Sequence, residues 1–134
     1  MSEDTVLVEV AERIATITFN RPQKRNAMNP ALNIRMLEVL DEIESRDDVG
    51  VVVLTGAGES WSAGMDLKEY FRDNDDKPRS ATLKARRQSG GWWQRLMYFE
   101  KPTIAMVNGW CFGGAFTPLV ACDLAIAARR PGSG

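Results

Sequence analysis

The 134-residue sequence contains no histidine, the side chain that most often serves as general base and as metal ligand. Catalysis by Ser-His or Cys-His pairs and metal sites built on imidazole are therefore excluded. Only two cysteines are present, Cys111 and Cys122, which cannot form a disulfide framework and do not have zinc-motif spacing. Free, buried thiols are typical of a reducing compartment, so we expect a cytoplasmic protein without a bound metal.

An excess of charge is also lacking, since 17 Lys and Arg residues oppose 18 Asp and Glu residues. This balance favours neither nucleic acid nor an anionic membrane surface as a partner. No apolar run approaches the roughly 18 residues of a membrane span, and the acidic start Met1–Asp4 is unlike a signal peptide. Hydrophobic residues make up 44% of the chain, enough for the core of one ordinary domain.

Apolar residues follow strand and helix periods in alternation, which indicates an α/β fold. We expect a tight turn at Ala11-Glu12 between the first two strands, and Asn29-Pro30 as the start of the first helix. The β-branched run at 49–54 is typical of a strand covered on both faces, and the apolar runs at 103–107 and 124–128 are also predicted to be core strands. The expected strands are 6–10, 15–19, 49–54, 103–107 and 124–128, and the expected helices are 29–46, 67–72, 81–99 and 115–121.

Two glycine-containing loops, at 63–66 and 112–115, follow predicted strands just before a predicted helix. Backbone N–H groups at such places carry positive partial charge, and two that converge from different loops form an oxyanion hole. Glycine suits this role because a Cβ would block the substrate's approach. Spacing alone favours ordinary turn glycines, so the residues by themselves leave both interpretations open.

Motifs for binding nucleotides are missing or incomplete. Gly56 and Gly58 lack the third glycine of a dinucleotide fingerprint, and no Gly-Lys-Ser/Thr sequence of a P-loop occurs. Residues 77–95 are basic without one acidic residue, a pattern more typical of a solvated helix face than of a phosphate site. Trp92 and Trp93 in this stretch favour a partly buried helix.

Several segments, in this order, resemble motifs of the crotonase (enoyl-CoA hydratase/isomerase) superfamily. The resemblance implies an α/β fold, a crotonase-like ββα spiral that is incomplete because only its N-terminal half matches. Residues 1–128 are then the N-terminal part of a crotonase-like domain. The matching segments are 18–28, which resembles the family's NRP…NA(L/M) loop, 51–56 with 62–68, which resembles its first oxyanion-hole segment, and 102–109 through 122–125, which resembles its second.

We expect the tail 129–134 to match no part of the family, and a frameshift and a cloning linker are two hypotheses for it. In the family, the segment that follows brings the catalytic glutamate that handles water and the α-proton. A chain without this glutamate is expected to be inactive or nearly so. Full-length members of the family are homo-oligomers, trimers or hexamers.

Within the superfamily, residues 64–71 and 108–114 are most similar to the hydroxycinnamoyl-CoA (feruloyl-CoA) hydratase-lyases. This resemblance implies hydration of a 4-hydroxycinnamoyl-CoA thioester, then retro-aldol cleavage to an aromatic aldehyde such as vanillin and acetyl-CoA. Thr117 stands where simple hydratases carry a glutamate, which favours the lyases. Other crotonase-type hydratases or isomerases, aryl-CoA dehalogenases and an inactive CoA-binding fragment remain as alternatives.

The resemblance also implies roles for single residues. The backbone N–H groups of Met65 and Gly114 match the oxyanion-hole donors, and Tyr70 matches the tyrosine that binds the substrate's phenolic oxygen. No permanent cofactor is implied, because coenzyme A enters as part of the substrate thioester. The positions that match the family's contacts with the nucleotide end of CoA are Lys24, Ala27, Met28 and Ala63.

Overall fold

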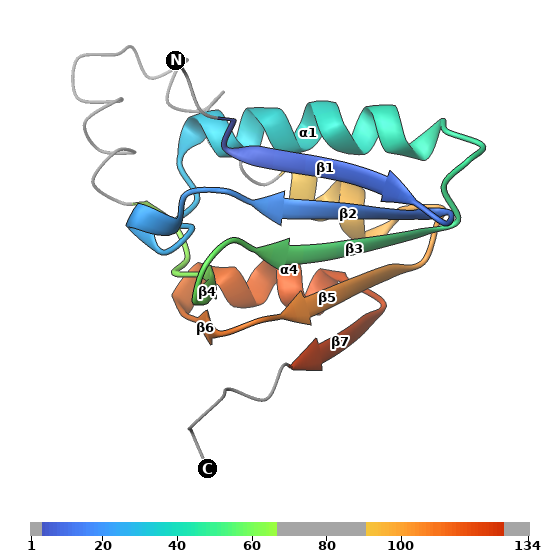
Figure 1. Ribbon diagram of the computed structural model, residues 1–134. Coiled ribbons are helices and arrows are strands. Elements are labelled where there is room, and N and C mark those ends of the chain that lie inside the picture. The colour runs from blue at the N-terminus through green and yellow to red at the C-terminus, as the bar shows by residue number, and fades with distance from the viewer. Residues whose placement is uncertain (1–3, 67–90, 128–134) are drawn as a thin grey trace.

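The fold is described from a computed structural model that covers residues 4–66 and 91–127. Its main feature is a five-stranded sheet in the order β1-β2-β3-β5-β7 (Figure 1). The β1–β2 pair is antiparallel and every other neighbouring pair is parallel, so four strands share one carboxyl edge. The strands are β1 (Val6–Ala11), β2 (Ile14–Phe19), β3 (Val51–Gly56), β5 (Thr103–Val107) and β7 (Leu124–Ala127).

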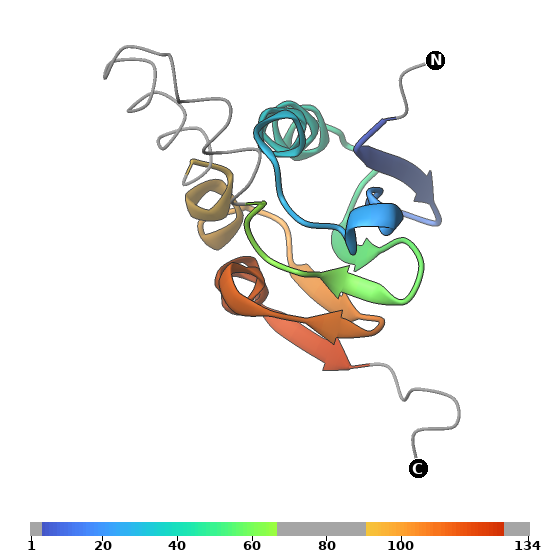
Figure 2. The ribbon, with the colours of Figure 1, turned by 90° about the vertical axis from the view of Figure 1, so that its left-hand side faces the viewer.

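Helices lie on one side of this sheet (Figure 2). They are α1 (Pro30–Glu44), a helical segment at 91–97, and α4 (Phe116–Ala121). The predicted start of α1 is confirmed: Asn29 is the N-cap, and its Oδ1 accepts from the Leu32 N–H at 2.9 Å. The predicted helix 67–72, Tyr70, most of the predicted helix 81–99 and the tail 129–134 lie outside the described residues.

The core lies between α1 and the sheet. Ile17 and Phe19 of β2 are fully buried, and each such side chain stabilises the fold by about 1.5–3 kcal/mol. Phe19 packs edge-on against Trp61, with ring centroids 5.3 Å apart, and also contacts Trp92. Trp92 is fully buried and its Nε1 donates to Asn33 Oδ1 at 2.8 Å, so the predicted partly buried helix is confirmed for residues 91–97.

The first turn lies one residue later than predicted. Ala11 still pairs with Ile14, which leaves Glu12 and Arg13 as a two-residue loop. Both loop residues have positive φ, 52° and 68°, as the right-handed twist of a hairpin requires. The carbonyl oxygen of Arg13 accepts from the Gly50 N–H at 2.7 Å, which ties the turn to the start of β3.

Two predicted core strands are less buried than expected. Val52 and Leu54 face the helices and are fully buried, whereas Val51 and Val53 on the opposite face are half-buried. The prediction that this strand is covered on both faces is therefore wrong for the described residues. All of β7 is exposed, because it is the edge strand of the sheet rather than an interior one.

A second, two-stranded sheet was missed because both its strands lie inside predicted loops. It consists of β4 (Ser60–Ser62) and β6 (Trp110–Cys111), which pair in parallel beyond the carboxyl edge of the main sheet (Figure 2). Strands of two and three residues are too short to show a period of two. They also pair across about 50 residues of chain, which no local pattern reveals.

No helix within residues 4–66 and 91–127 has the length and apolarity to cross a bilayer. Within the same ranges, no three His, Cys, Asp or Glu side chains are grouped so that they could hold a metal ion.

The two cysteines are free and half-buried, and they are expected to react with iodoacetamide more slowly than an exposed thiol. Burial raises the pKa of Cys122 to about 11 and also raises the pKa of Cys111. Only the thiolate reacts, so Cys122 in the folded protein should label roughly 100-fold more slowly at pH 8 than the ordinary thiol pKa allows. Mass spectrometry of timed labelling, with the urea-unfolded chain as control, checks this; equal rates in both states would contradict it.

Candidate functional site

Two backbone segments meet at the carboxyl edge of the sheet, one after β4 and one after β6. The N–H of Phe112 donates to the carbonyl oxygen of Ser62 at 3.1 Å. A Cβ placed on Gly64 would lie 2.8 Å from the carbonyl oxygen of Phe112 and 3.0 Å from the nitrogen of Gly114. A Cβ on Gly114 would lie 3.7 Å from the nitrogen of Met65. Glycine is needed at position 64 because of this close approach and because its φ is +92°.

The structure therefore brings together the two predicted donors, the N–H groups of Met65 and Gly114. Gly114 lies in a 3-10 turn, Gly113–Ala115, that leads into α4. Among the described residues, neither N–H group donates to a backbone carbonyl. Two N–H groups from neighbouring segments can bind an oxygen that carries or develops negative charge when both point at it. That they serve as an oxyanion hole stays a prediction at this point.

The predicted CoA loop lies directly beside this segment. The N–H of Ala63 donates to the carbonyl oxygen of Arg25 at 2.9 Å, and Met28 forms a parallel bridge with Met65. Lys24 is exposed and Ala27 is half-buried, whereas the side chain of Met28 is fully buried. The four residues thus share one region, but their contact with CoA is untested.

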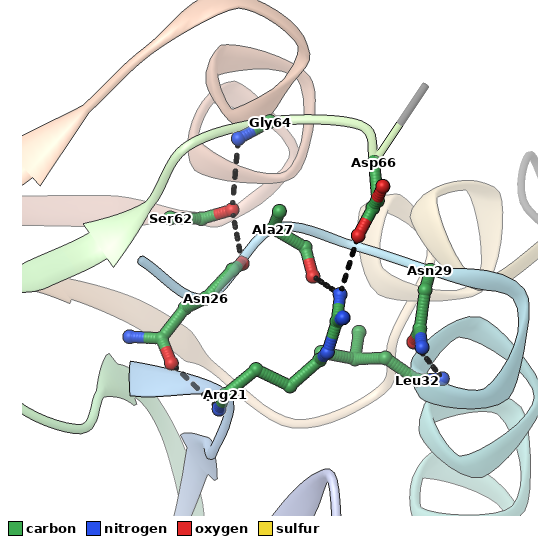
Figure 3. A network of polar contacts seen from close by, with 8 residues as sticks. All are labelled: Arg21, Asn26, Ala27, Asn29, Leu32, Ser62, Gly64 and Asp66. Atoms are coloured by element: carbon green, nitrogen blue, oxygen red, sulfur yellow. Dashed lines mark hydrogen bonds and ion pairs between the residues drawn. The ribbon is translucent and has the colours of Figure 1, made fainter. Parts of the chain in front are cut away.

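A buried asparagine that the sequence analysis did not single out holds these loops together (Figure 3). The Nδ2 of Asn26 donates to the carbonyl oxygen of Ser60 at 2.8 Å, and its Oδ1 accepts from the Arg21 N–H at 2.8 Å. Ser62 Oγ donates to the carbonyl oxygen of Asn26 and accepts from the Gly64 N–H. Asn26 has φ +57°, a conformation that asparagine tolerates better than most residues.

Asn108 has a similar role between the exits of β3 and β5 and was also not singled out. Its Oδ1 accepts from the Gly56 N–H at 3.0 Å, and its Nδ2 donates to the carbonyl oxygens of Gly56 and Gly58. This side chain thereby fixes the spacing between the two chain segments that lead into the site. The only available signal was an asparagine directly after a predicted strand.

The chain is similar in sequence to proteins of known family. The enoyl-CoA hydratase/isomerase family model matches residues 9–133, a range that includes all but the last residue of the tail expected to lie outside the family. The chain is 59% identical to a hydroxycinnamoyl-CoA hydratase-lyase of Pseudomonas fluorescens, covering 92% of this chain and 45% of that protein. It is 38% identical to 4-chlorobenzoyl coenzyme A dehalogenase-2 of an Arthrobacter species, covering 96% of this chain and 47% of that protein. The chain thus spans about half the length of the curated relatives it matches.

Solved structures support the same assignment. An enoyl-CoA hydratase/isomerase from Xanthobacter autotrophicus Py2 superposes with a TM-score of 0.85 at 32% identity, covering 94% of this chain and 46% of that one. The α/β crotonase-like fold predicted from the motifs is confirmed, and about half of the neighbour's fold is represented. The chain belongs to the enoyl-CoA hydratase/isomerase (crotonase) family.

Proposed function

We propose that this chain forms the thioester-binding part of a hydroxycinnamoyl-CoA hydratase-lyase. The observation that carries the proposal is the meeting of the Met65 and Gly114 N–H groups at the carboxyl edge of the sheet. The choice of lyase rests on the 59% identity to the Pseudomonas enzyme, against 38% to the dehalogenase. The substrate is a 4-hydroxycinnamoyl-CoA thioester, and coenzyme A belongs to it rather than to a resident cofactor.

In this proposal the thioester carbonyl oxygen accepts hydrogen bonds from both N–H groups. Water adds to Cβ, negative charge develops on the carbonyl oxygen, and Cα is then protonated. Next the β-hydroxyl loses its proton, and the Cα–Cβ bond breaks to give the aldehyde and a second thioester enolate, whose protonation gives acetyl-CoA. Each N–H donor is worth about 3–4 kcal/mol to the charged transition states.

The rest of the assignment follows the family resemblance. Lys24, Ala27, Met28 and Ala63 form the region that receives the nucleotide end of CoA. A glutamate outside residues 1–128 moves the protons, a role worth about 10²–10⁴-fold in rate. We therefore expect the 134-residue chain by itself to turn over slowly or not at all, and the complete enzyme to be a cytoplasmic homo-oligomer.

A panel of three thioesters tests this function: feruloyl-CoA, crotonyl-CoA and 4-chlorobenzoyl-CoA. Vanillin and acetyl-CoA are expected from the first, with little hydration of the second and no chloride released from the third. Hydration without aldehyde would indicate a hydratase, and chloride release would favour the dehalogenase suggested by the Arthrobacter relative. Calorimetric titration with CoA on the same sample identifies a form that binds without turnover.

Tyr70→Phe is expected to weaken selection for the 4-hydroxyl group of the substrate. A site that hydrogen-bonds a substrate hydroxyl loses discrimination when its partner is deleted. The measurement is the ratio of kcat/KM on 4-hydroxycinnamoyl-CoA and cinnamoyl-CoA, in a form of the protein that turns over feruloyl-CoA. We expect this ratio to fall about two- to tenfold, the range of one hydrogen bond to a neutral group; an unchanged ratio would show that Tyr70 does not bind the 4-hydroxyl group.

A further inference from the structure

A buried ion pair joins the two loops of the site (Figure 3). Nη1 of Arg21 lies 3.1 Å from Oδ2 of Asp66, and the two side chains are only 8% and 12% exposed. The same nitrogen donates to the carbonyl oxygen of Ala27 at 2.5 Å. Arg21 therefore contacts both the loop that contains Ala27 and the segment that contains Met65, the residue before Asp66.

The hydrogen bonds between these loops determine where the N–H of Met65 points. The Met28 N–H donates to the carbonyl oxygen of Gly64 at 2.7 Å, and the Asp66 N–H donates to the carbonyl oxygen of Met28 at 2.9 Å. This is the pattern of a single parallel bridge between Met28 and Met65. In such a bridge the residue between the two bonded neighbours directs its own N–H and C=O away from the partner strand. The N–H of Met65 is thus turned away from Met28, and Gly114 approaches its nitrogen.

We propose that Arg21 and Asp66 are positioning residues that aim the N–H of Met65 into the site. The proposal rests on the proposed function, which gives that N–H its role. The ion pair holds Asp66 on one side of Met65, while Ser62 Oγ accepts from the Gly64 N–H at 3.1 Å on the other. The peptide group that carries the donor is therefore held from both flanks. An error of about 1 Å in such a group costs on the order of 100-fold in rate.

The first test needs no ligand, because it measures the position of the N–H directly. In the folded wild type we expect a nuclear Overhauser effect between the amide proton of Met65 and the α-protons of Gly114. Asp66→Asn removes the charge but keeps the size and one oxygen, and Arg21→Gln removes the guanidinium. Both variants should lose or weaken this signal, whereas Arg35→Gln, which alters an exposed ion pair on α1, should keep it.

A signal of wild-type strength in folded Asp66→Asn would overturn the proposal. Circular dichroism shows which variants are folded. If Arg21→Gln is not folded, Asp66→Asn alone decides the question.

The second test measures turnover of feruloyl-CoA in the same variants of an active form. We expect kcat to fall about 10- to 100-fold in Asp66→Asn with KM changed less than about threefold, because a misaimed donor affects the transition state most. Arg21→Lys keeps the positive charge but loses the planar guanidinium with its several N–H donors, so its kcat should lie between those of wild type and Arg21→Gln. Unchanged kcat per folded molecule would leave only a structural role and overturn the proposal. If the active form hydrates feruloyl-CoA but releases no aldehyde, the proposed function is refuted, while the contact between the Met65 amide proton and the Gly114 α-protons still decides whether Arg21 and Asp66 position this N–H.

Discussion

Replacing Gly114 by proline is expected to lower kcat on feruloyl-CoA by about 10²–10³-fold, the cost of one oxyanion donor. Proline has no N–H, so the thioester oxygen loses one of its two proposed hydrogen bonds. The loss should be found in kcat more than in KM, because the bond strengthens as charge develops on the oxygen. Steady-state kinetics of an active form that carries the substitution measure this directly.

Gly114→Ala is the matched control for this prediction. It keeps the N–H, and its Cβ would meet the flexible Met65 side chain, at 3.2 Å from Cγ. We expect a loss of kcat below about tenfold, since the Met65 side chain can yield by a few tenths of an ångström; obstruction of the substrate by the new Cβ should raise KM instead. Circular dichroism must show that both variants are folded. Wild-type turnover in a folded Gly114→Pro variant would remove this N–H from the mechanism.

Gly109→Ala is expected to destabilise the fold by about 3 kcal/mol, the upper end of the range for overpacking. A Cβ at this position would lie 1.9 Å from the carbonyl oxygen of Glu59, which is backbone and cannot rotate away. Residues 59 and 109 lie directly before β4 and β6. The clash would therefore push apart the two strands that lead into the site. Urea unfolding followed by circular dichroism should show a lower midpoint with an unchanged slope.

Gly91→Ala provides the contrast. Its Cβ would lie 3.6 Å from Leu37 Cδ2, an ordinary contact, and alanine favours the helical conformation of this segment. We expect a neutral or slightly stabilising effect, up to about 1 kcal/mol. Equal unfolding midpoints for the Gly109 and Gly91 variants would show that position 109 can rearrange and that the small sheet is not rigid.

Local chemistry explains which elements could be predicted. The start of α1 depends on Asn29 and Pro30, which act within one helical turn, so the sequence identifies it correctly. The hairpin was recognised from its alternation, but its turn was misplaced because nothing in Glu12 or Arg13 favours positive φ. The exposure of β7 could not be predicted, because an apolar strand shows the same composition at the edge of a sheet as inside it.

The site was predictable only in part. Gly64 stands directly before Met65, and Gly113 directly before Gly114, each within a motif of the family. The resemblance therefore assigns the donor roles of Met65 and Gly114 without any geometry. Asn26, by contrast, acts on Ser60 and Asn108 acts on Gly56, over 34 and 52 residues. A side chain that bonds a distant backbone group has no periodicity and no local partner, so only the folded arrangement identifies it.

The central claim is that two backbone N–H groups bind the thioester carbonyl oxygen. Its most direct test is the infrared stretch of a ¹³C-labelled carbonyl in bound 3-(4-hydroxyphenyl)propionyl-CoA, a saturated thioester that cannot be hydrated. Two hydrogen bonds polarise the carbonyl, so we expect a lower frequency when bound than in water, and a smaller shift in Gly114→Pro. A bound thioester whose carbonyl frequency equals that in water would show that these N–H groups do not bind its oxygen.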